Sequence, residues 1–289
     1  MKKFELTAES KINIFGKKLF RIKALISFGD VEEGETGGWI EKEENLEQSS
    51  GDAWVYGDAE VSGNARVYGD ARVSGNAWVS GDAEVSGDAE VYDNARVSGN
   101  AGVYDNARVS GNAGVYDNAR VSGNAEVSGN AGVYDNAEVY GNARVSGNAW
   151  VSGNAGVYDN ARVSGNAGVY DNARVSGNAG VYDNARVSGD AEVSGDAEVY
   201  DNARVSGNAE VYGNADYTTI HGFGTQFRTT TFFQCEDKQI RVSCGCFLGT
   251  IPEFREQVKN TREGKIAEEY LMIADLMEKH FVKEKESGE

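Results

Sequence analysis

The chain of 289 residues is poor in several residue types that most globular proteins use. It contains one Pro, two His and three Cys, and no apolar run approaches the roughly 20 residues that cross a bilayer. Its formal net charge of -18 disfavours nucleic-acid phosphate and anionic membrane surfaces as direct partners. The N-terminus lacks the apolar stretch of a signal peptide, so we expect a cytoplasmic protein that does not enter a membrane.

The three cysteines lie close together, which is unlike a secreted disulfide framework. Cys235, Cys244 and Cys246, with His221, would supply four ligands of a type that zinc accepts. However, strand alternation places Cys244 and Cys246 on one face as packing residues, and a Cys nucleophile would need His221 as its base. We therefore expect reduced, buried thiols, with no metal and no cofactor.

A six-residue repeat fills the middle of the chain. From Gly51 the sequence reads GDAWVY, GDAEVS, GNARVY, GDARVS, and it keeps this register without insertion through Tyr212, which makes 27 hexads. A degenerate hexad, 213–218, closes the run. In each hexad Ala and Val are two residues apart, so both face inward in an extended strand, and Gly or Asp followed by Asn or Asp makes a corner. Strands this short must stack on one another to be stable.

The pattern V-S-G-N-A-R resembles the left-handed β-helix hexapeptide family. That resemblance implies a triangular prism with three hexads per turn and left-handed coiling, hence nine coils and a rod roughly 40 Å long. The interior would be filled by Val and Ala, so any ligand or partner must bind on the outside or at the ends. The predicted fold is mainly β, with a rod at residues 51–218 between two end regions.

Residues 1–50 break the repeat and predict an N-terminal β cap. Two strands are expected, through Ile12–Phe15 and Leu19–Phe28, joined at residues 15–18. The following residues, among them Gly37-Gly38-Trp39-Ile40 and Asn45-Leu46, resemble the cap of YdcK-like hexapeptide proteins. Proteins of that family are commonly labelled as transferases.

Residues 219–289 predict a small α+β module. A β-hairpin is expected from Thr229–Phe233 and Ile240–Cys246, then a short helix from an N-cap at Thr250 to about Asn260, and a longer helix over 263–283. With RTTTFF and IRVSCGCFLGT, the segment resembles the C-terminal module of uncharacterised phage and prophage proteins of Gram-positive bacteria. The resemblance implies a phage origin, with the cytoplasm of the bacterial host as the location.

The outside of the rod is acidic, with ten Arg and no Lys against 23 Asp and Glu. Asp52, Asp70, Asp88 and Asp105 are expected to line one corner together with Asp159 and Asp196. Two interpretations stay open, a merely soluble solenoid or an anionic surface for a basic partner.

Three tryptophans, Trp54, Trp78 and Trp150, occupy the outward position between Ala and Val. Trp78 and Trp150 are 72 residues apart and should share a face. They either anchor a protein partner or lie against neighbouring Arg and Tyr side chains.

The enzymatic alternative is a hexapeptide-repeat acyltransferase that acts at a cleft between subunits. Such enzymes use a His as general base and often a loop extruded from the coils. Here His221 and His280 both lie beyond the rod, no loop interrupts the repeat, and the repeat has no Lys to bind a CoA phosphate. We therefore expect a non-enzymatic binding or scaffold protein. A narrower hypothesis is that it antagonises a host nucleic-acid-handling defence protein by mimicking DNA with its carboxylates.

The last predicted helix carries an apolar surface broader than one hairpin needs. Tyr270, Leu271, Met272 and Leu276 are the predicted contacts of a homo-oligomer, while internal packing within the module is the alternative use of the same residues.

Overall fold

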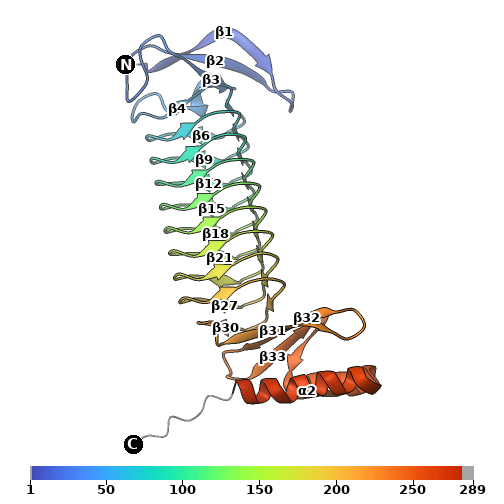
Figure 1. The fold of residues 1–289 in the computed structure, drawn as a ribbon. Coiled ribbons are helices and arrows are strands. Elements are labelled where there is room, and N and C mark those ends of the chain that lie inside the picture. The colour runs from blue at the N-terminus through green and yellow to red at the C-terminus, as the bar shows by residue number, and fades with distance from the viewer. Residues whose placement is uncertain (1, 282–289) are drawn as a thin grey trace, which may run out of the picture.

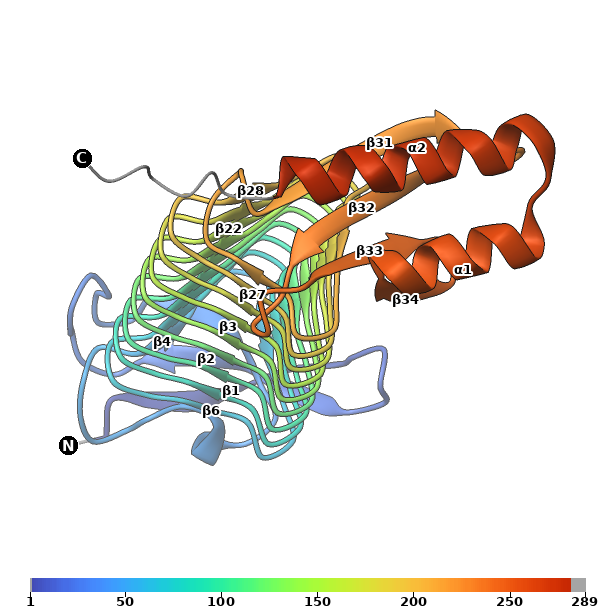
Figure 2. The same ribbon diagram turned by 90° about the horizontal axis from the view of Figure 1, so that it is seen from below.

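The computed structural model describes residues 2–281 and shows a straight rod with a different structure at each end (Figure 1). The rod contains 27 strands of two residues, one in each hexad, from β4 (Trp54–Val55) to β30 (Glu210–Val211). They form three parallel sheets, so each coil has three sides, as the view along the rod shows (Figure 2). The predicted solenoid with three hexads per coil is confirmed, while its left hand stays a prediction.

Each sheet contains every third strand of the rod. The first sheet is continuous with the cap and contains β5 (Glu60–Val61), β8 (Trp78–Val79), β11 (Arg96–Val97), β14 (Gly114–Val115), β17 (Gly132–Val133), β20 (Trp150–Val151), β23 (Gly168–Val169), β26 (Arg186–Val187) and β29 (Arg204–Val205). The second contains β4, β7 (Arg72–Val73), β10 (Glu90–Val91), β13 (Arg108–Val109), β16 (Glu126–Val127), β19 (Arg144–Val145), β22 (Arg162–Val163), β25 (Gly180–Val181) and β28 (Glu198–Val199). The third contains β6 (Arg66–Val67), β9 (Glu84–Val85), β12 (Gly102–Val103), β15 (Arg120–Val121), β18 (Glu138–Val139), β21 (Gly156–Val157), β24 (Arg174–Val175), β27 (Glu192–Val193) and β30.

The interior of the rod is a column of alanine and valine. Every Ala and Val of the hexads from Ala53 to Val211 is at most 1% exposed. Complete burial of a valine side chain contributes about 1.5–3 kcal/mol relative to exposure, so the stacked valines are the main source of stability. Because small side chains fill the interior, the rod offers binding sites only on its outer surface and at its ends.

Hydrogen bonds join each coil to the next. The N–H groups of Trp150 and Ser152 donate to the carbonyls of Ala167 and Val169, at 2.9 and 3.0 Å. Side-chain amides extend this pattern at the corners, where Asn118 Nδ2 donates to Asn136 Oδ1, and Asn136 Nδ2 donates to Asn154 Oδ1, both at 3.1 Å. Stacked asparagine ladders of this kind stabilise in-register parallel strands.

The first residue of every hexad has a positive φ. Glycine occupies this position in 19 hexads and aspartate in eight. Five of these eight aspartates compensate for the cost of a left-handed conformation with a hydrogen bond: Asp159 Oδ2, at φ 57°, accepts the N–H of Gly177 in the next coil at 3.1 Å. The same bond is made by Asp93 to Gly111, Asp105 to Gly123, Asp135 to Gly153 and Asp171 to Gly189.

Tyrosine rings lie over outward-facing glycines. In the segment Gly132-Val133-Tyr134, a Cβ at Gly132 would lie 2.2 Å from the ring of Tyr134. The same overlap occurs at Gly102, Gly114, Gly156, Gly168 and Gly180, each with the tyrosine two residues later. Every outward glycine of the repeat thus leaves room for a ring.

The cap begins with the antiparallel strands β1 (Phe4–Ile12) and β2 (Lys18–Ala24), followed by β3 (Thr36–Ile40) and the 3₁₀ turn η1 (Glu43–Asn45). The predicted first strand, 12–15, is wrong, since β1 ends at Ile12. The reason is Asn13, whose Oδ1 accepts the N–H groups of Phe15 and Lys17 and so holds these residues in the hairpin turn. β3 then pairs parallel with β5 and starts a partial coil above the nine regular ones.

The cap binds the carbonyl groups that the first coil leaves free. Lys3 Nζ donates to the carbonyls of Gly51 and Ala53 at 3.2 Å, and burial lowers the pKa of this amine. Asn45 Nδ2 donates to the carbonyls of Gly63 and Ala65. This end of the rod is therefore closed against edge-to-edge pairing.

The module contains an antiparallel sheet of β31 (Tyr217–Phe223), β32 (Arg228–Gln234), β33 (Ile240–Cys244) and β34 (Phe247–Thr250), covered by α1 (Ile251–Thr261) and α2 (Gly264–His280). The predicted hairpin and both helices are present, and Thr250 and Glu253 form the capping box that starts α1. The outer strands β31 and β34 were not predicted from the sequence. The end predicted for the second helix, Lys283, lies outside the described residues.

The degenerate hexad 213–218 does not form a further coil. The carboxylate of Asp216 accepts the N–H groups of Tyr212 and Gly213, Ala215 is exposed, and Tyr217 already belongs to β31. The side chains of Tyr217, Phe233 and Cys235 instead pack into the open end of the rod core. None of the helices in the described residues has the length and apolar character needed to cross a membrane.

We predict that Gly132→Ala lowers the melting temperature, because the added methyl group forces the Tyr134 ring out of place and overpacking costs about 1–3 kcal/mol. Thermal unfolding followed by circular dichroism measures the change. The double substitution Gly132→Ala with Tyr134→Ser should restore the melting temperature, since the ring is then absent. Equal destabilisation by the single and double variants would contradict this packing rule.

We also predict that substitution of Asp159 by glycine and by alanine has different effects on the stability of the rod. Asp159→Gly should leave stability almost unchanged, because glycine adopts the same positive φ without strain. Asp159→Ala should destabilise by about 1 kcal/mol or more, since it keeps a Cβ and loses the bond to Gly177. Urea unfolding of the two variants side by side tests the difference, and an alanine variant as stable as the glycine variant would refute it.

Candidate interaction surface

Both ends of the molecule project over the same side of the rod. The β1–β2 hairpin and the C-terminal module extend to one side in Figure 1. At the cap end, the ring centroids of Phe15 and Trp78 lie 5.6 Å apart, and at the module end Leu248 lies beside Arg186 and Arg204. We call the outer surface of the first sheet from Trp78 to Ser206 the concave face, because it lies between these two overhangs.

A row of aromatic side chains runs along the middle of the concave face. The rings of Tyr116 and Tyr134 are stacked with centroids 5.2 Å apart, and Trp150 follows at 5.5 Å from Tyr134. Trp150 is 51% exposed, although large apolar side chains are costly to leave in water. The row is thus the part of the concave face best suited to bury a partner's side chains.

Glycines occupy the outward positions on both sides of Trp150. Trp150 lies on β20, and its cross-strand neighbours in the adjacent coils are Gly132 and Gly168. Neither neighbour has a side chain of its own, and the rings of Tyr134 and Tyr170 lie over these glycines, yet about half of the indole stays exposed. By contrast, Trp78 is half-buried between Phe15 and Arg96, whose guanidinium lies 4.9 Å from the indole centroid.

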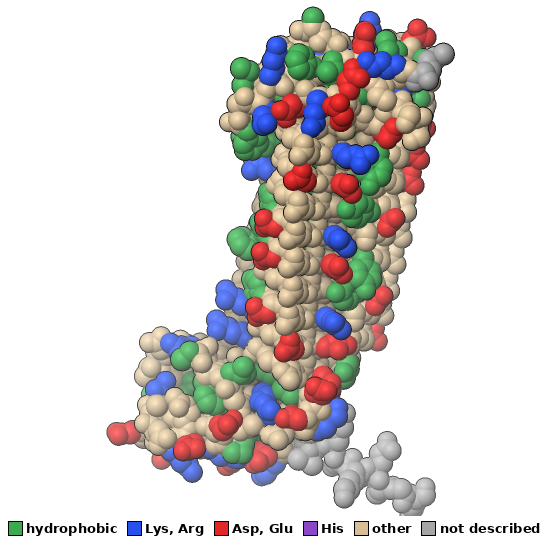
Figure 3. All heavy atoms as spheres, turned by 180° about the vertical axis from the view of Figure 1, so that it is seen from behind, with side chains coloured by type: hydrophobic (Ala, Val, Ile, Leu, Met, Phe, Trp, Pro, Cys, Tyr) green, Lys and Arg blue, Asp and Glu red, His purple; other side chains and the backbone are tan. Residues whose placement is uncertain are grey.

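The concave face differs in charge from the rest of the molecule. Its outward positions carry Arg96, Arg186 and Arg204, and the sheet's one outward glutamate, Glu60, is paired with Lys11 at 2.9 Å. The outward positions of the third sheet instead repeat Arg, Glu and Gly in successive coils as far as Glu192, and Figure 3 shows separated charges of both signs along the rod. All fifteen aspartates of the repeat lie at corners.

Trp78 and Trp150 share the concave face, where the repeat predicts them to be together. Trp54 is a correction, because it is fully buried and cannot contact a partner. The cap covers its outward position, with Phe28 at 5.4 Å and Phe4 at 6.1 Å between ring centroids. Periodicity could not reveal this burial, since the covering residues lie outside the repeat.

The four predicted aspartates do lie at one corner of the rod, but they do not form a column of free carboxylates. Asp70 Oδ1 accepts the N–H of Asp52, and Asp105 accepts the N–H of Gly123 from its left-handed position. After Asp88 the column continues with asparagine at five successive coils, 106–178, and ends at Asp196. Several of these carboxylates are therefore engaged by the backbone.

The predicted oligomer contacts on α2 divide into buried and exposed residues. Tyr270 is 7% exposed and donates its hydroxyl proton to the carbonyl of Phe223, so its predicted role in an interface is wrong. Leu271 packs partly on the module core. Met272 and Leu276 are 70% and 58% exposed, and they lie one helical turn apart.

The cysteines differ in their surroundings. Burial raises the pKa of the Cys235 thiol to about 11, so it stays protonated near neutral pH and is a poor nucleophile. Cys244 is partly buried and accepts a hydrogen bond from Thr230 Oγ1, whereas Cys246 is exposed. The prediction that all three are buried is wrong for Cys246, because Gly245 turns the chain before the next strand. Within residues 2–281 no group of three or more His, Cys, Asp or Glu side chains could hold a metal ion.

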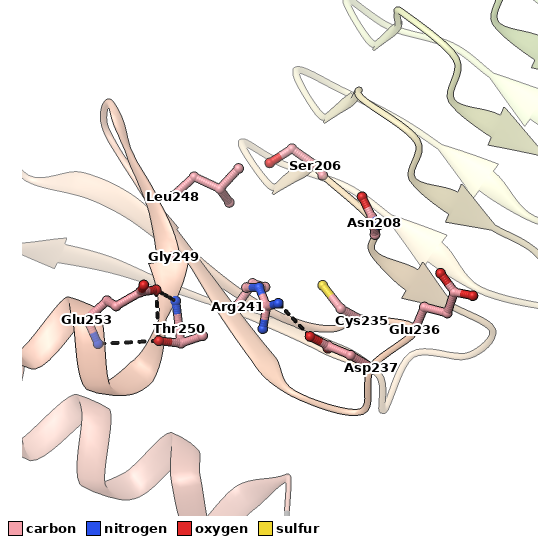
Figure 4. Close-up of a pocket in the computed structure, with 11 residues that line it drawn as sticks. Ser206, Asn208, Cys235, Glu236, Asp237, Arg241, Leu248, Gly249, Thr250 and Glu253 are labelled. Atoms are coloured by element: carbon pink, nitrogen blue, oxygen red, sulfur yellow. Dashed lines mark hydrogen bonds and ion pairs between the residues drawn. The ribbon is translucent and has the colours of Figure 1, made fainter.

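A pocket of about 730 Å³ lies where the module meets the last coil. Figure 4 shows Arg241 paired with Asp237 at 2.6 Å and Glu253 bonded to Thr250, while Glu236 at the same pocket has no interaction drawn to it. Hydrogen bonds from the backbone of Gln239 and from Arg241 lower the pKa of Asp237, and those from the backbone and hydroxyl of Thr250 lower the pKa of Glu253. These groups hold the hairpin and α1 in place, and none of them points to a reaction.

Comparison with known proteins bears on the rod. The family model described as YdcK Beta solenoid repeat matches seven segments, 59–75, 65–81, 89–105, 101–117, 137–156, 155–170 and 169–183. No curated protein matches the chain. The matched segments lie within the coils of the rod, so the repeats of this β-solenoid are similar to the YdcK repeat over these residues.

Proposed function

We propose that the protein is a non-enzymatic binding scaffold that presents its concave face to a protein partner. The observation that carries this proposal is the aromatic row that ends in the exposed Trp150, on the one side of the rod that both ends overhang. Rigid aromatic side chains at the centre of a surface are typical anchors of protein interfaces.

The charges of the concave face indicate the chemistry of the partner. Arg96 and Arg186 lie on either side of the aromatic row, and the one glutamate of the sheet is neutralised by Lys11. A partner that supplies apolar side chains opposite Trp150 and carboxylates opposite the arginines fits this face. The basic partner expected from the overall charge would instead have to bind at the aspartate corners.

DNA mimicry receives less support than docking on the concave face. A mimic needs regular columns of free carboxylates, and the corner of Asp52, Asp70 and Asp88 is interrupted by asparagine at five coils. The carboxylate of Asp105 already accepts a backbone N–H. The phage or prophage origin stays part of the proposal and rests on the resemblance of the C-terminal module.

Acyl transfer, the alternative, would have to use His221 on β31. Its Nδ1 lies 3.0 Å from Thr229 Oγ1 on an exposed sheet, and no histidine lines the pockets described above. Acetyl-CoA binding that is lost in His221→Ala would favour the enzymatic alternative over the scaffold.

Photo-crosslinking tests the scaffold proposal. We predict that p-benzoylphenylalanine at Ser152, beside Trp150, captures a host protein in Gram-positive cells, and that Trp150→Glu abolishes the capture. Glu occupies the same outward position in eight hexads, so the rod should tolerate it. The matched controls are a crosslinker at Ser128 on the second sheet and the variant Arg162→Glu.

The outcome of the crosslinking experiment depends on position. A product formed at Ser152 and unaffected by Arg162→Glu supports the proposal. Products that form equally at Ser152 and Ser128, or that survive Trp150→Glu, would contradict it. A third crosslinker position, Asn124, lies at the aspartate corner. Capture at Asn124 alone would favour docking at that corner.

We further propose that α2 joins two or more copies of the chain through Met272 and Leu276, which leave apolar surface in water. Light scattering should give a multiple of 31.0 kDa that falls to the single-chain mass in Leu276→Asp or Met272→Asp, with the β-sheet circular dichroism retained. A wild-type protein of single-chain mass at working concentration would rule out this assembly.

A further inference from the structure

Two arginines face the same pocket at the module end of the concave face. Arg186 and Arg204 are cross-strand neighbours on β26 and β29, and the turn from Gly245 to Leu248 forms the opposite wall. The pocket has a volume of about 400 Å³. Arg204 Nη1 donates to the carbonyl of Gly245 at 3.2 Å, which fixes one guanidinium against this wall.

Neither of the two guanidinium groups forms an ion pair in the structure. Among residues 2–281, no carboxylate lies within 4.0 Å of either guanidinium. Asp171 also lines the pocket and keeps its negative charge, but its carboxylate accepts the N–H of Gly189 and pairs with neither arginine. Like charges directly opposite on neighbouring strands repel each other, so this pair lowers stability unless an anion joins it.

The rod has one other cross-strand pair of arginines, which has an ion pair and no wall formed by the module. Arg144 and Arg162 are cross-strand neighbours on the second sheet, yet Arg144 lies 3.7 Å from Glu126. Within residues 2–281 neither Arg144 nor Arg162 hydrogen-bonds to the cap or module, whereas Arg204 donates to Gly245 of the module. The Arg186–Arg204 pair is therefore distinguished by an enclosing wall and by the lack of an ion pair with a carboxylate.

The pocket also offers neutral hydrogen-bond donors. The hydroxyls of Ser188, Ser206 and Ser243 line it, and Tyr170 lies at the edge towards the aromatic row. Two guanidinium groups supply ten N–H donors in planar forks, which match the oxygens of a tetrahedral dianion better than those of a single carboxylate. A carboxylate would neutralise only one of the two arginines.

We propose that this pocket binds a phosphomonoester dianion, with the phosphate between Arg186 and Arg204 and the esterified group directed along the concave face past Tyr170. A phosphomonoester carries close to two negative charges above its second pKa of about 6, and so balances both arginines. The proposal is independent of the protein partner, because it rests on the arginine pair and the module wall.

The test uses the full chain with inorganic phosphate and phenyl phosphate as probes, at pH 8 and constant ionic strength set with chloride. Isothermal titration should detect binding of phosphate, and phenyl phosphate should bind more tightly through its ring. Arg186→Gln should weaken both by about tenfold or more, because a charge-assisted hydrogen bond and one of two counter-charges are lost. Arg162→Gln on the open face is the matched control and should bind as the wild type does.

A second readout separates binding from a structural role of the arginine. In chloride alone, Arg186→Gln should melt at the same or a higher temperature than the wild type, since it removes a repulsion. With phosphate, the wild type should gain stability and the variant should not. The proposal is overturned if neither probe binds, if Arg162→Gln weakens binding as much as Arg186→Gln, or if Arg186→Gln already destabilises the rod in chloride.

Discussion

The stacking of each coil on the next, in register at an interval of 18 residues, is the constraint on which the rest of this structure depends. A two-residue strand has no stability alone, so every hexad relies on the coils above and below it for hydrogen bonds and for the burial of Ala and Val. The same interval aligns the asparagine amides into ladders and lets a corner aspartate such as Asp159 accept an N–H from the next coil. A change of one residue in register would break all of these contacts at once.

This constraint explains why the rod could be predicted from the sequence and the surface only in part. The spacing of Ala and Val fixes which residues face inward, and the interval of 18 correctly places Trp78 and Trp150 on one sheet. It could not show that Trp54 is buried, because Phe4 and Phe28 come from the irregular cap. Likewise, the helical spacing on α2 identifies apolar residues, but only the packed module shows that Tyr270 is internal while Met272 and Leu276 are exposed.

The outward positions of the hexads vary in residue type, so the surface of the rod differs from one coil to the next. Glycine at an outward position comes with tyrosine two residues later, since the ring occupies the space that a side chain would fill. The twelve-residue unit GNAGVYDNARVS spans two of the three sides of a coil, so consecutive copies place their tyrosines on different faces, such as Tyr158 on the third sheet and Tyr170 on the first. The concave face thus depends on the number of hexads between the cap and the module, which sets the angle between the two overhangs.

The alignment of the two overhangs by the coil interval is tested most directly by removing parts of the rod. In a Cys244→Ser background, spin labels at Phe15→Cys and at the exposed native Cys246 allow the distance between cap and module to be measured by pulsed electron paramagnetic resonance. Deletion of 153–170 removes one whole coil and should shorten this distance by about 5 Å, one strand spacing, with both overhangs still on one side. Deletion of 153–164 removes two hexads, preserves the inward Ala and Val pattern, and should lengthen the distance because the module turns to another side of the rod. Equal shortening in both deletions, or loss of the β-sheet circular dichroism in the deletion of a whole coil, would contradict the account.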